Sequence, residues 1–418
     1  MNTAANSFSP FPLSPPLPSS AGTATGVAAA GTRQTYDSIL CFGGVDWWYH
    51  NRGHYDLQMM RELSAVVPVL YVNSIGMRVS APGQHSQLAR RIGRKLRSVL
   101  RGRVQVKDGL SVFSPFAPPV RFGRSFLNRA LSLQLRAACR SMGFRQPLVW
   151  VACPTAVGVI GSLDPAGVIY QRTDRYEEYP GVDRARVASQ DLTLKTLADL
   201  TLFCSSAVLD EEQAQCRRAL FADHGVDFSH FANAGDQHAP VAELAGLSSP
   251  RIGYVGNLEP HRVDHRLLEH IARSLPDLPL VIVGPGPLSA TVAALPNVHR
   301  FPQQPYEKVA RFTAACDVLI MPWCDNAWIR ACNPIKLKEY LAVGRPVVTT
   351  PFDELRRYDG YVRVAGSYDA FVDAIRLALR AGDSPQRLRS RVQNETWTAK
   401  ARLVLDTLRD TCGLHAAP

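Results

Sequence analysis

Short apolar runs recur in two separate series along the chain, and this pattern constrains the fold more than any other feature of the sequence. Helical patterns lie between consecutive runs, for example over residues 54–65. Such alternation is typical of a parallel β-sheet that is covered on both faces by helices. The predicted strands span residues 38–44, 68–72, 148–153, 167–171 and 200–205 in the first series, and 251–256, 279–284, 317–322 and 346–350 in the second.

The interruption between the two series predicts two α/β domains, each a doubly wound, Rossmann-like sheet, that face a central cleft. We expect residues 1–35, which are rich in Ser, Pro, Ala and Thr, to form a disordered extension. The two domains then cover residues 36–232 and 251–394, and the polar residues 233–250 form the linker. A final helix in residues 395–418 has no partner strand, so we expect it to pack back toward the N-terminal domain.

Charge and cysteine spacing narrow the classes of partner and site. The chain has 47 Lys and Arg against 36 Asp and Glu, a net charge of +11 that favours an anionic partner. Its nine cysteines form no CxxC pair, which argues against a disulfide framework and a zinc site and favours a reducing cytoplasm. No apolar run approaches the ~20 residues that span a bilayer. The N-terminus lacks the pattern of a secretory signal.

Three common phosphate-binding motifs are absent. The first predicted strand is not followed by GxGxxG, no GxxxxGK[ST] occurs, and the chain has no DxD triplet. We therefore expect neither a bound cofactor nor a metal ion. A phosphorylated substrate would be neutralised by backbone amides, helix N-termini and basic side chains.

The segment NPIKLKEYLAVGRPVVTT at residues 333–350 is the most informative part of the sequence. Asn333 and Pro334 can begin a helix, which places Lys336 in the first turn and Glu339 on the same side one turn later. A cation at a helix N-terminus is unfavourable unless an anion lies between them. Lys336 and the helix N-terminus can therefore hold a diphosphate while Glu339 binds ribose hydroxyls. The alternative is an ordinary amphipathic helix on which both side chains face solvent.

This segment resembles the donor-binding segment of GT-B glycosyltransferases, which has the pattern P-x-K-x-x-E-[YA]-x-A-x-G-x-P-V-V from helix to strand. Four further segments resemble that family in the same order, at residues 224–231, 252–258, 281–287 and 301–323. The resemblance covers residues 38–380 and implies that domain 251–394 binds a nucleotide sugar and domain 36–232 binds the acceptor. The donor-binding residues that it implies are Gly256, Asn257, Arg262, Gly284, Gly286, Phe301, Asn333, Lys336 and Glu339.

One departure from the common retaining members of this family concerns the mechanism. Those members carry two Glu residues eight positions apart, and the earlier position here is Ala331. The chain is more similar to the membrane-associated glucuronosyltransferases of xanthan synthesis and to transferases of the teichuronic acid type, which implies an inverting mechanism. The same comparison implies that Asp174, which follows a predicted strand, is the base that deprotonates the acceptor. Glu177 and Glu178 are alternatives, and Asp174 can instead cap the turn after its strand.

The loop after the first predicted strand carries Asp46, Trp47, Trp48, Arg52 and His54. Aromatic faces suit sugar rings or a lipid-linked acceptor, and Arg52 or His54 can contact phosphate. We therefore expect these five residues to bind the acceptor. The alternative is a tryptophan pair that packs beneath the loop.

A basic amphipathic helix is predicted from Arg90 to Arg103, where seven residues are basic and none is acidic. Apolar side chains fall near one face of that helix, which favours binding to an anionic membrane surface. The alternative is an ordinary solvated helix. Nucleic acid is not expected as a partner, because no interleaved aromatic residues or nucleic-acid-binding module accompany the charges.

The resemblance thus implies a hexosyltransferase that moves a sugar from a nucleoside diphosphate, above all UDP, to a lipid-linked saccharide or polysaccharide of the bacterial envelope. We expect an inverting, metal-independent enzyme in the cytoplasm, on the inner face of the plasma membrane. Two alternatives stay open. One is a nucleotide-sugar epimerase of the same fold, and the other is a transferase-like protein that binds a partner without catalysis.

Overall fold

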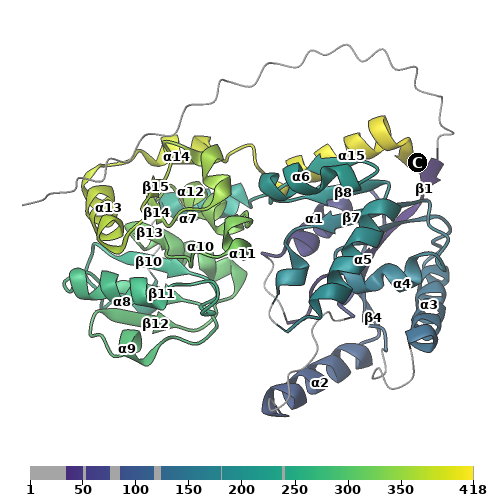
Figure 1. The fold of residues 1–418 in the computed structure, drawn as a ribbon, viewed down its shortest axis with the longest axis horizontal. Coiled ribbons are helices and arrows are strands. Elements are labelled where there is room, and N and C mark those ends of the chain that lie inside the picture. The colour runs from purple at the N-terminus through teal and green to yellow at the C-terminus, as the bar shows by residue number, and fades with distance from the viewer. Residues whose placement is uncertain are drawn as a thin grey trace, which may run out of the picture. The chain divides into compact units, whose positions relative to one another are not determined.

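The computed structural model describes residues 34–49, 53–75, 85–116, 124–179, 181–237 and 241–417, with the side chains of residues 85–92 and 124 outside this description. Two large sheets, each with helices on both faces, organise the described chain (Figure 1). Both consist mainly of parallel strands, as the alternation of apolar runs and helical patterns predicts. The predicted α/β class with two doubly wound domains is confirmed.

The N-terminal sheet has eight strands in the order β4-β5-β3-β2-β6-β7-β8-β9 and is parallel except for the β4–β5 pair. One face packs on α1 and α15, and the other on α3, α4 and α5. The strands are β2 (Ser38–Phe42), β3 (Val69–Val72), β4 (Arg103–Lys107), β5 (Leu110–Phe113), β6 (Pro147–Val151), β7 (Gly167–Arg172), β8 (Leu200–Phe203) and β9 (Ala219–Phe221). The helices are α1 (Tyr55–Leu63), α2 (His85–Leu100), α3 (Arg124–Ser141), α4 (Val157–Ile160), α5 (Arg184–Leu197) and α6 (Ser206–Glu212).

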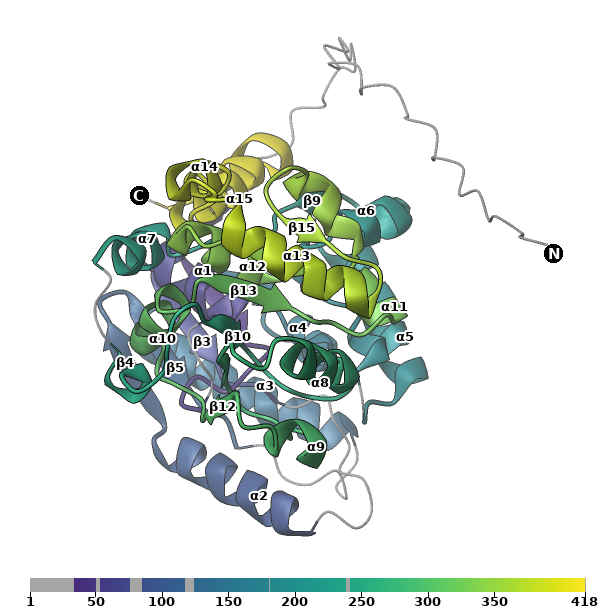
Figure 2. The same cartoon turned by 90° about the vertical axis from the view of Figure 1, so that its left-hand side faces the viewer.

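The C-terminal sheet has six parallel strands in the order β12-β11-β10-β13-β14-β15. Helices α7, α10, α12 and α14 cover one face, and α8 and α13 cover the other (Figure 2). The strands are β10 (Ile252–Val255), β11 (Leu280–Val283), β12 (Val298–Phe301), β13 (Val318–Met321), β14 (Val347–Thr349) and β15 (Arg363–Val364). The helices are α7 (Phe228–Gln237), α8 (His265–Ser274), α9 (Ala290–Ala293), α10 (Tyr306–Ala314), α11 (Ala327–Arg330), α12 (Ile335–Val343), α13 (Tyr368–Arg380) and α14 (Pro385–Ser390).

The segment between the two sheets is more ordered than a polar linker. Helix α7 extends to Gln237 and packs against α10 and α12, because Phe231, Ala232 and Gly235 form a buried face. A short 3-10 helix, Ala242–Leu244, follows, and Leu244 joins the core of the C-terminal domain. Most of the segment expected as a linker at 233–250 therefore belongs to the C-terminal domain.

The C-terminal helix α15 (Trp397–Cys412) returns to the N-terminal domain (Figure 1). Its buried residues Trp397, Ala401, Val404 and Leu408 pack in the core beside α1. Beyond α15, strand β16 (Leu414–Ala416) pairs in parallel with β1 (Gln34–Tyr36). Gln34 and Thr35, which were expected to be disordered, thus lie in a strand, and residues 1–33 lie outside the described chain.

Candidate active site

The glycine segments that follow β10 and β11 lie against each other and against α12. Gly284 has φ +145°, and a Cβ atom there would lie 1.9 Å from the carbonyl oxygen of Gly256. A Cβ atom at Gly256 would lie 2.4 Å from Lys336 Cε. Only glycine fits at Gly284, and the missing Cβ atom at Gly256 leaves room for the stem of Lys336 beside the backbone. The carboxyl end of β10, beside β13, is where strand order reverses and where ligands bind in such sheets.

Lys336 and Glu339 lie on one side of α12, near its start. Pro334 is the N-cap residue, so Lys336 is the second helical residue, one position from the expected register. Burial lowers the pKa of Lys336, and Arg262 lowers it further, while Glu339 opposes the shift. Burial raises the pKa of Glu339 to about 7, although Lys336 opposes it. A cation that is poorly solvated beside the open amides of a helix is suited to bind an anion.

The other predicted donor residues surround this pair or support it. Arg262 stacks on the Trp328 ring, with Cζ 4.4 Å from the centroid, and its charge acts on both Lys336 and Asp174. Asn257 shapes the glycine loop, because Oδ1 accepts from the amide of Glu259 at 3.0 Å. A Cβ atom at Gly286, where φ is +104°, would lie 2.9 Å from Asn257 Oδ1. Phe301 ends β12, and its ring packs 5.5 Å from that of Phe312.

The side chain of Asn333 contacts the N-terminal domain. Its Nδ2 donates to the carbonyl oxygen of Cys204 at 2.8 Å and lies 3.4 Å from Asp223 Oδ2, both in the N-terminal domain. Within the described chain its Oδ1 is buried and has no hydrogen-bond partner. The side chain therefore joins the domains at the start of α12 and leaves one buried acceptor open.

Asp174 lies half-buried after β7, between segments of the two domains. The hydroxyl of Tyr179 donates to Asp174 Oδ2 at 2.6 Å, and the thiol of Cys332 lies 3.8 Å from Oδ1. Burial raises the pKa of Asp174 above its ordinary value, although Tyr179 and Arg262 oppose the shift. A carboxylate with a raised pKa accepts a proton more readily, which suits a general base.

The two alternative bases are already paired with cations. Both carboxylate oxygens of Glu177 accept from the guanidinium of Arg172 at 2.9 Å, and Arg172 is almost fully buried. Arg172 holds the pKa of Glu177 below its ordinary value, although burial opposes this. Glu178 forms an ion pair with Arg184. These pairings favour Asp174 as the base.

Ala331, at the position where the retaining relatives carry Glu, is part of an apolar contact between the domains. It is buried against Phe203 and Val208 of the N-terminal domain. A carboxylate at this position would lose its hydration without a cation from that cluster. The small apolar side chain of Ala331 therefore suits this apolar cluster, whereas a glutamate would not.

The predicted acceptor residues are held by contacts within the N-terminal domain. Asp46 accepts from the amide of Trp48 at 3.0 Å and from the Ser98 hydroxyl at 2.9 Å. The Trp47 ring packs on Tyr71, and the Trp48 ring stacks beneath Arg101. These contacts agree with the tryptophan pair packing beneath its loop. His54, which is exposed, precedes α1, and Arg52 lies outside the described residues.

Sequence reasoning missed three residues that contact Asp174 or pack beside it. Tyr179 holds Asp174, and its ring lies 6.2 Å from that of Trp328, which belongs to α11 in the other domain. Cys332 follows α11 and contacts Asp174 directly. No local spacing relates residues 174–179 to residues 328–332. Only the packing of the two domains brings them together.

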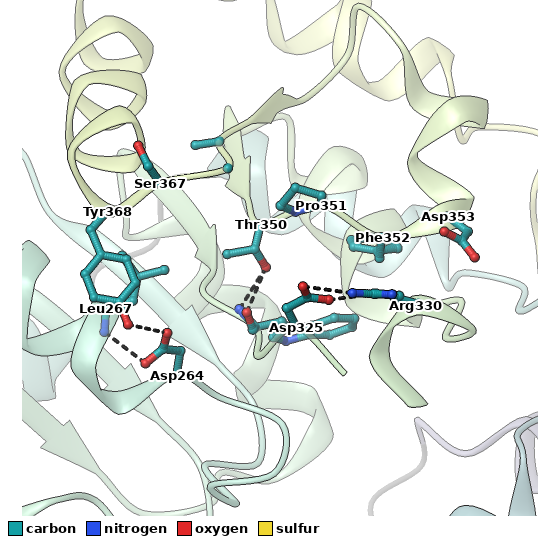
Figure 3. A pocket seen from close by; sticks show the side chains of 13 residues that line it. Asp264, Leu267, Asp325, Arg330, Thr350, Pro351, Phe352, Asp353, Ser367 and Tyr368 are labelled. Atoms are coloured by element: carbon teal, nitrogen blue, oxygen red, sulfur yellow. Dashed lines mark hydrogen bonds and ion pairs between the residues drawn. The ribbon is translucent and has the colours of Figure 1, made fainter. Parts of the chain in front are cut away.

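A separate pocket of about 450 Å³ lies at the carboxyl ends of β13 and β14 (Figure 3). None of the residues predicted from the sequence lines it. Its residues are Asp264, Leu267, Trp323, Asp325, Arg330, Thr350, Pro351, Phe352, Asp353, Ala365, Gly366, Ser367 and Tyr368.

Among the described residues, no three His, Cys, Asp or Glu side chains are grouped as metal ligands. None of the helices in the described part of the chain has the length and apolar character of a membrane-spanning segment.

Residues 249–381 match the protein family described as glycosyl transferases group 1. The chain is also 30% identical over 178 residues to a Bacillus subtilis (strain 168) protein named as a teichuronic acid biosynthesis glycosyltransferase, TuaH. That match covers 40% of this chain and 44% of the relative, so the chain spans less than half of the curated relative that it matches.

Solved structures match nearly the whole chain. Sucrose-phosphate synthase from Thermosynechococcus elongatus has a TM-score of 0.65 at 17% identity, and the match covers 90% of this chain and 98% of that one. Anabaena HepE, in complex with UDP and glucose, has a TM-score of 0.63 at 12% identity, with 90% and 100% covered. At these identities the likeness shows the fold, and it confirms the predicted GT-B architecture.

Proposed function

We propose that this GT-B chain, whose residues 249–381 match the family of group 1 glycosyl transferases, moves a hexosyl group from UDP to a hydroxyl of a lipid-linked saccharide or polysaccharide. The observation that carries the proposal is the position of Lys336 at the start of α12, against the glycine segments and beside Glu339 and Arg262. The name of TuaH refers to teichuronic acid biosynthesis, which supports an envelope polysaccharide as the acceptor.

Donor binding follows from the charges around α12. Lys336, Arg262 and the first amides of α12 would hold the two phosphates and stabilise the negative charge that grows on the leaving UDP. Glu339, one turn further, would accept hydrogen bonds from the ribose hydroxyls. Structures of HepE contain UDP and UDP-glucose, which supports UDP as the nucleotide here. We propose that these protein groups, and not a metal ion, neutralise the diphosphate.

Asp174 would act as the base of an inverting transfer. The acceptor oxygen attacks the anomeric carbon, its proton passes to a carboxylate oxygen of Asp174, and the bond from the anomeric carbon to the diphosphate breaks to release UDP. Tyr179 keeps the carboxylate in one orientation. Closure of the two domains over the donor would exclude water and limit hydrolysis.

The base assignment is tested by Asp174→Asn with a radiolabelled UDP-sugar and a membrane extract as acceptor. We expect UDP affinity to stay within about twofold of wild type and transfer to fall by about 100-fold or more. Glu178→Gln, which removes a paired carboxylate four residues away, is the control and should keep its activity. Near-normal transfer by Asp174→Asn would remove this residue from the base role.

The same assay without acceptor separates the alternatives. A transferase leaves the UDP-sugar unchanged apart from slow hydrolysis. Formation of an epimeric UDP-sugar without acceptor would instead show an epimerase of the same fold. Absence of both UDP binding and turnover would favour the binding-protein alternative.

Helix α2 would bring the enzyme to an anionic membrane surface on the cytoplasmic side. It lies at the edge of the N-terminal domain in both views (Figures 1 and 2). Arg94 and Arg97 on α2 and Arg101 directly after it are exposed, next to the exposed side chains of Leu96 and Leu100. The helix ends at Leu100, so Arg103, which was expected within it, instead begins β4. The side chains of Arg90 and Arg91 lie outside the described residues. Exposed leucines beside a row of arginines suit an interface of lipid headgroups.

Vesicle co-sedimentation tests this surface. We expect binding to vesicles that contain phosphatidylglycerol and weaker binding to pure phosphatidylcholine. Replacing Arg94, Arg97 and Arg101 by Glu should weaken binding by about 100-fold or more, at ~1 kcal/mol for each basic residue. The control replaces three exposed arginines of the C-terminal domain, Arg266, Arg273 and Arg376. Equal loss in both triple variants would contradict a specific role of α2.

A further inference from the structure

The pocket at the carboxyl ends of β13 and β14 is separate from the proposed donor site. It lies toward the face that α8 and α13 cover, whereas Lys336 and Glu339 belong to α12 on the opposite face. Its volume of about 450 Å³ is within the range of sites that bind small organic ligands. A second ligand therefore has room next to the nucleotide without sharing its residues.

Aromatic and charged side chains meet in this pocket (Figure 3). The rings of Trp323 and Phe352 pack with their centroids 5.3 Å apart, and Pro351 adds a further apolar surface. Arg330 donates to both oxygens of Asp325, at 2.7 and 2.9 Å, and both side chains are mostly exposed. A sugar ring needs an aromatic surface for its C–H face and paired donors and acceptors for its hydroxyls.

The charge of the lining disfavours a phosphorylated ligand. The lining carries three carboxylates, on Asp264, Asp325 and Asp353, and one guanidinium, on Arg330. The carboxylate of Asp264 is already used, because Oδ1 caps α8 and Oδ2 accepts from the Tyr368 hydroxyl at 2.7 Å. It still contributes a negative field, as do the other two. A diphosphate would be repelled here, whereas a neutral saccharide would not.

One short segment connects this pocket to Asp174. Arg330 lines the pocket, Trp328 on the same short helix contacts Tyr179, and Cys332 contacts Asp174. Asp353 begins the 3-10 helix Asp353–Tyr358, in which Glu354 accepts from the amide of Ser206 in the N-terminal domain. The pocket is thus at the edge where the two domains meet, close to the place where the acceptor hydroxyl would be deprotonated.

We propose that this pocket is a subsite for a neutral sugar unit of the acceptor, away from the hydroxyl that reacts. The inference rests on the proposed transferase function. It adds that the donor domain itself selects the acceptor, through the Trp323 ring and the Arg330–Asp325 pair.

Fluorine NMR of the full chain, labelled with fluorotryptophan, tests the subsite. The chain has six tryptophans, and Trp323→Phe identifies the Trp323 signal by its loss. Cellobiose, maltose and lactose are titrated separately, and UDP is titrated in a parallel arm. We expect at least one disaccharide to shift the Trp323 signal with saturation, while UDP leaves that signal in place. Arg330→Ala should weaken this saccharide binding about tenfold or more.

Arg376→Ala is the control, because it removes another exposed arginine that is paired with an aspartate, Asp373, outside the pocket. It should bind the disaccharide like wild type. The subsite is overturned if no disaccharide moves the Trp323 signal, if Arg330→Ala binds as well as wild type, or if UDP saturates the Trp323 signal. If no saccharide binds but UDP binds in a way that depends on Lys336, the subsite is contradicted and the proposed function is not. If wild type does not bind UDP at all, the proposed function itself is contradicted.

Discussion

Burial works against both charges of the Lys336–Glu339 pair. The pKa of Lys336 is lowered and that of Glu339 is raised to about 7, in each case chiefly because the side chain is removed from water. Such opposed shifts reduce the stability of the folded chain at neutral pH. They are expected where a site is prepared for a charged ligand that the protein itself does not provide.

Glu339→Gln should therefore stabilise the protein in a pH-dependent way. The folded pKa is above the ordinary value of 4.5, so the carboxyl costs nothing below about pH 4 and its full cost is reached above about pH 7. The shift corresponds to roughly 3 kcal/mol at about pH 8. Thermal unfolding of the variant and wild type at about pH 4 and pH 8 measures this difference. Equal Tm differences at both pH values would contradict the raised pKa of the buried Glu339 carboxyl. Glu243→Gln is the exposed control.

Tyr179→Phe should change the pH dependence of transfer. Its hydroxyl lowers the pKa of Asp174, so the variant should have a base with a higher pKa. Because transfer needs the deprotonated base, the acidic limb of the kcat profile should move to higher pH. Tyr170→Phe, which removes a tyrosine–aspartate hydrogen bond to Asp191 within the same domain, is the control. An unchanged profile in Tyr179→Phe would mean that this hydroxyl has only a structural role.

Two lysines of α12, two residues apart, have opposite roles. Lys338 is fully buried and lies 2.8 Å from Asp223 Oδ2 and 3.2 Å from Glu395, and Lys400 adds a contact to Asp223 at 2.5 Å. This cluster joins α12 to the N-terminal domain and α15. The sequence predicts the helix and its start to within one residue, but spacing alone cannot tell which lysine lies beside the glycine segment and which lies in the domain junction.

Replacing each lysine by Met should separate these roles. Lys338→Met removes one of the two lysines that neutralise the buried carboxylate of Asp223, and it should lower the free energy of unfolding by about 3–5 kcal/mol. Lys336→Met removes a cation whose burial is unfavourable and should leave stability unchanged or slightly higher. Urea unfolding of the two variants provides the comparison, and Asp223→Asn added to Lys338→Met should recover part of the loss. Similar losses for both lysines would contradict the division.

The buried strands were predictable from the sequence, and the contacts between distant segments were not. All nine predicted strands are present, as β2, β3, β6, β7, β8, β10, β11, β13 and β14, because runs buried on both faces are continuously apolar. Strands such as β4 and β12 were missed, since they are exposed or half-buried and carry charged residues. The pairing of β1 with β16 depends on the return of α15, which no local pattern specifies.

Some residues of the candidate site were likewise predictable from the sequence, and others were not. Lys336 and Glu339 follow from one segment of sequence, and the two glycine segments follow from strand ends. The environment of Asp174 does not, because Tyr179 comes from one domain and Trp328 and Cys332 from the other. The same packing turns Asn333 toward Cys204 and buries Ala331 against Phe203. Contacts between domains are thus the part of the site that sequence spacing leaves undetermined.

Whether Lys336 holds the diphosphate is measured by calorimetric titration of UDP and of uridine into wild type and Lys336→Met, with Lys308→Met as an exposed control. We expect wild type to prefer UDP to uridine, and Lys336→Met to reduce this preference by about 10- to 100-fold while it binds uridine as before. A Lys336→Met variant that keeps the full preference for UDP would show that the diphosphate is held elsewhere.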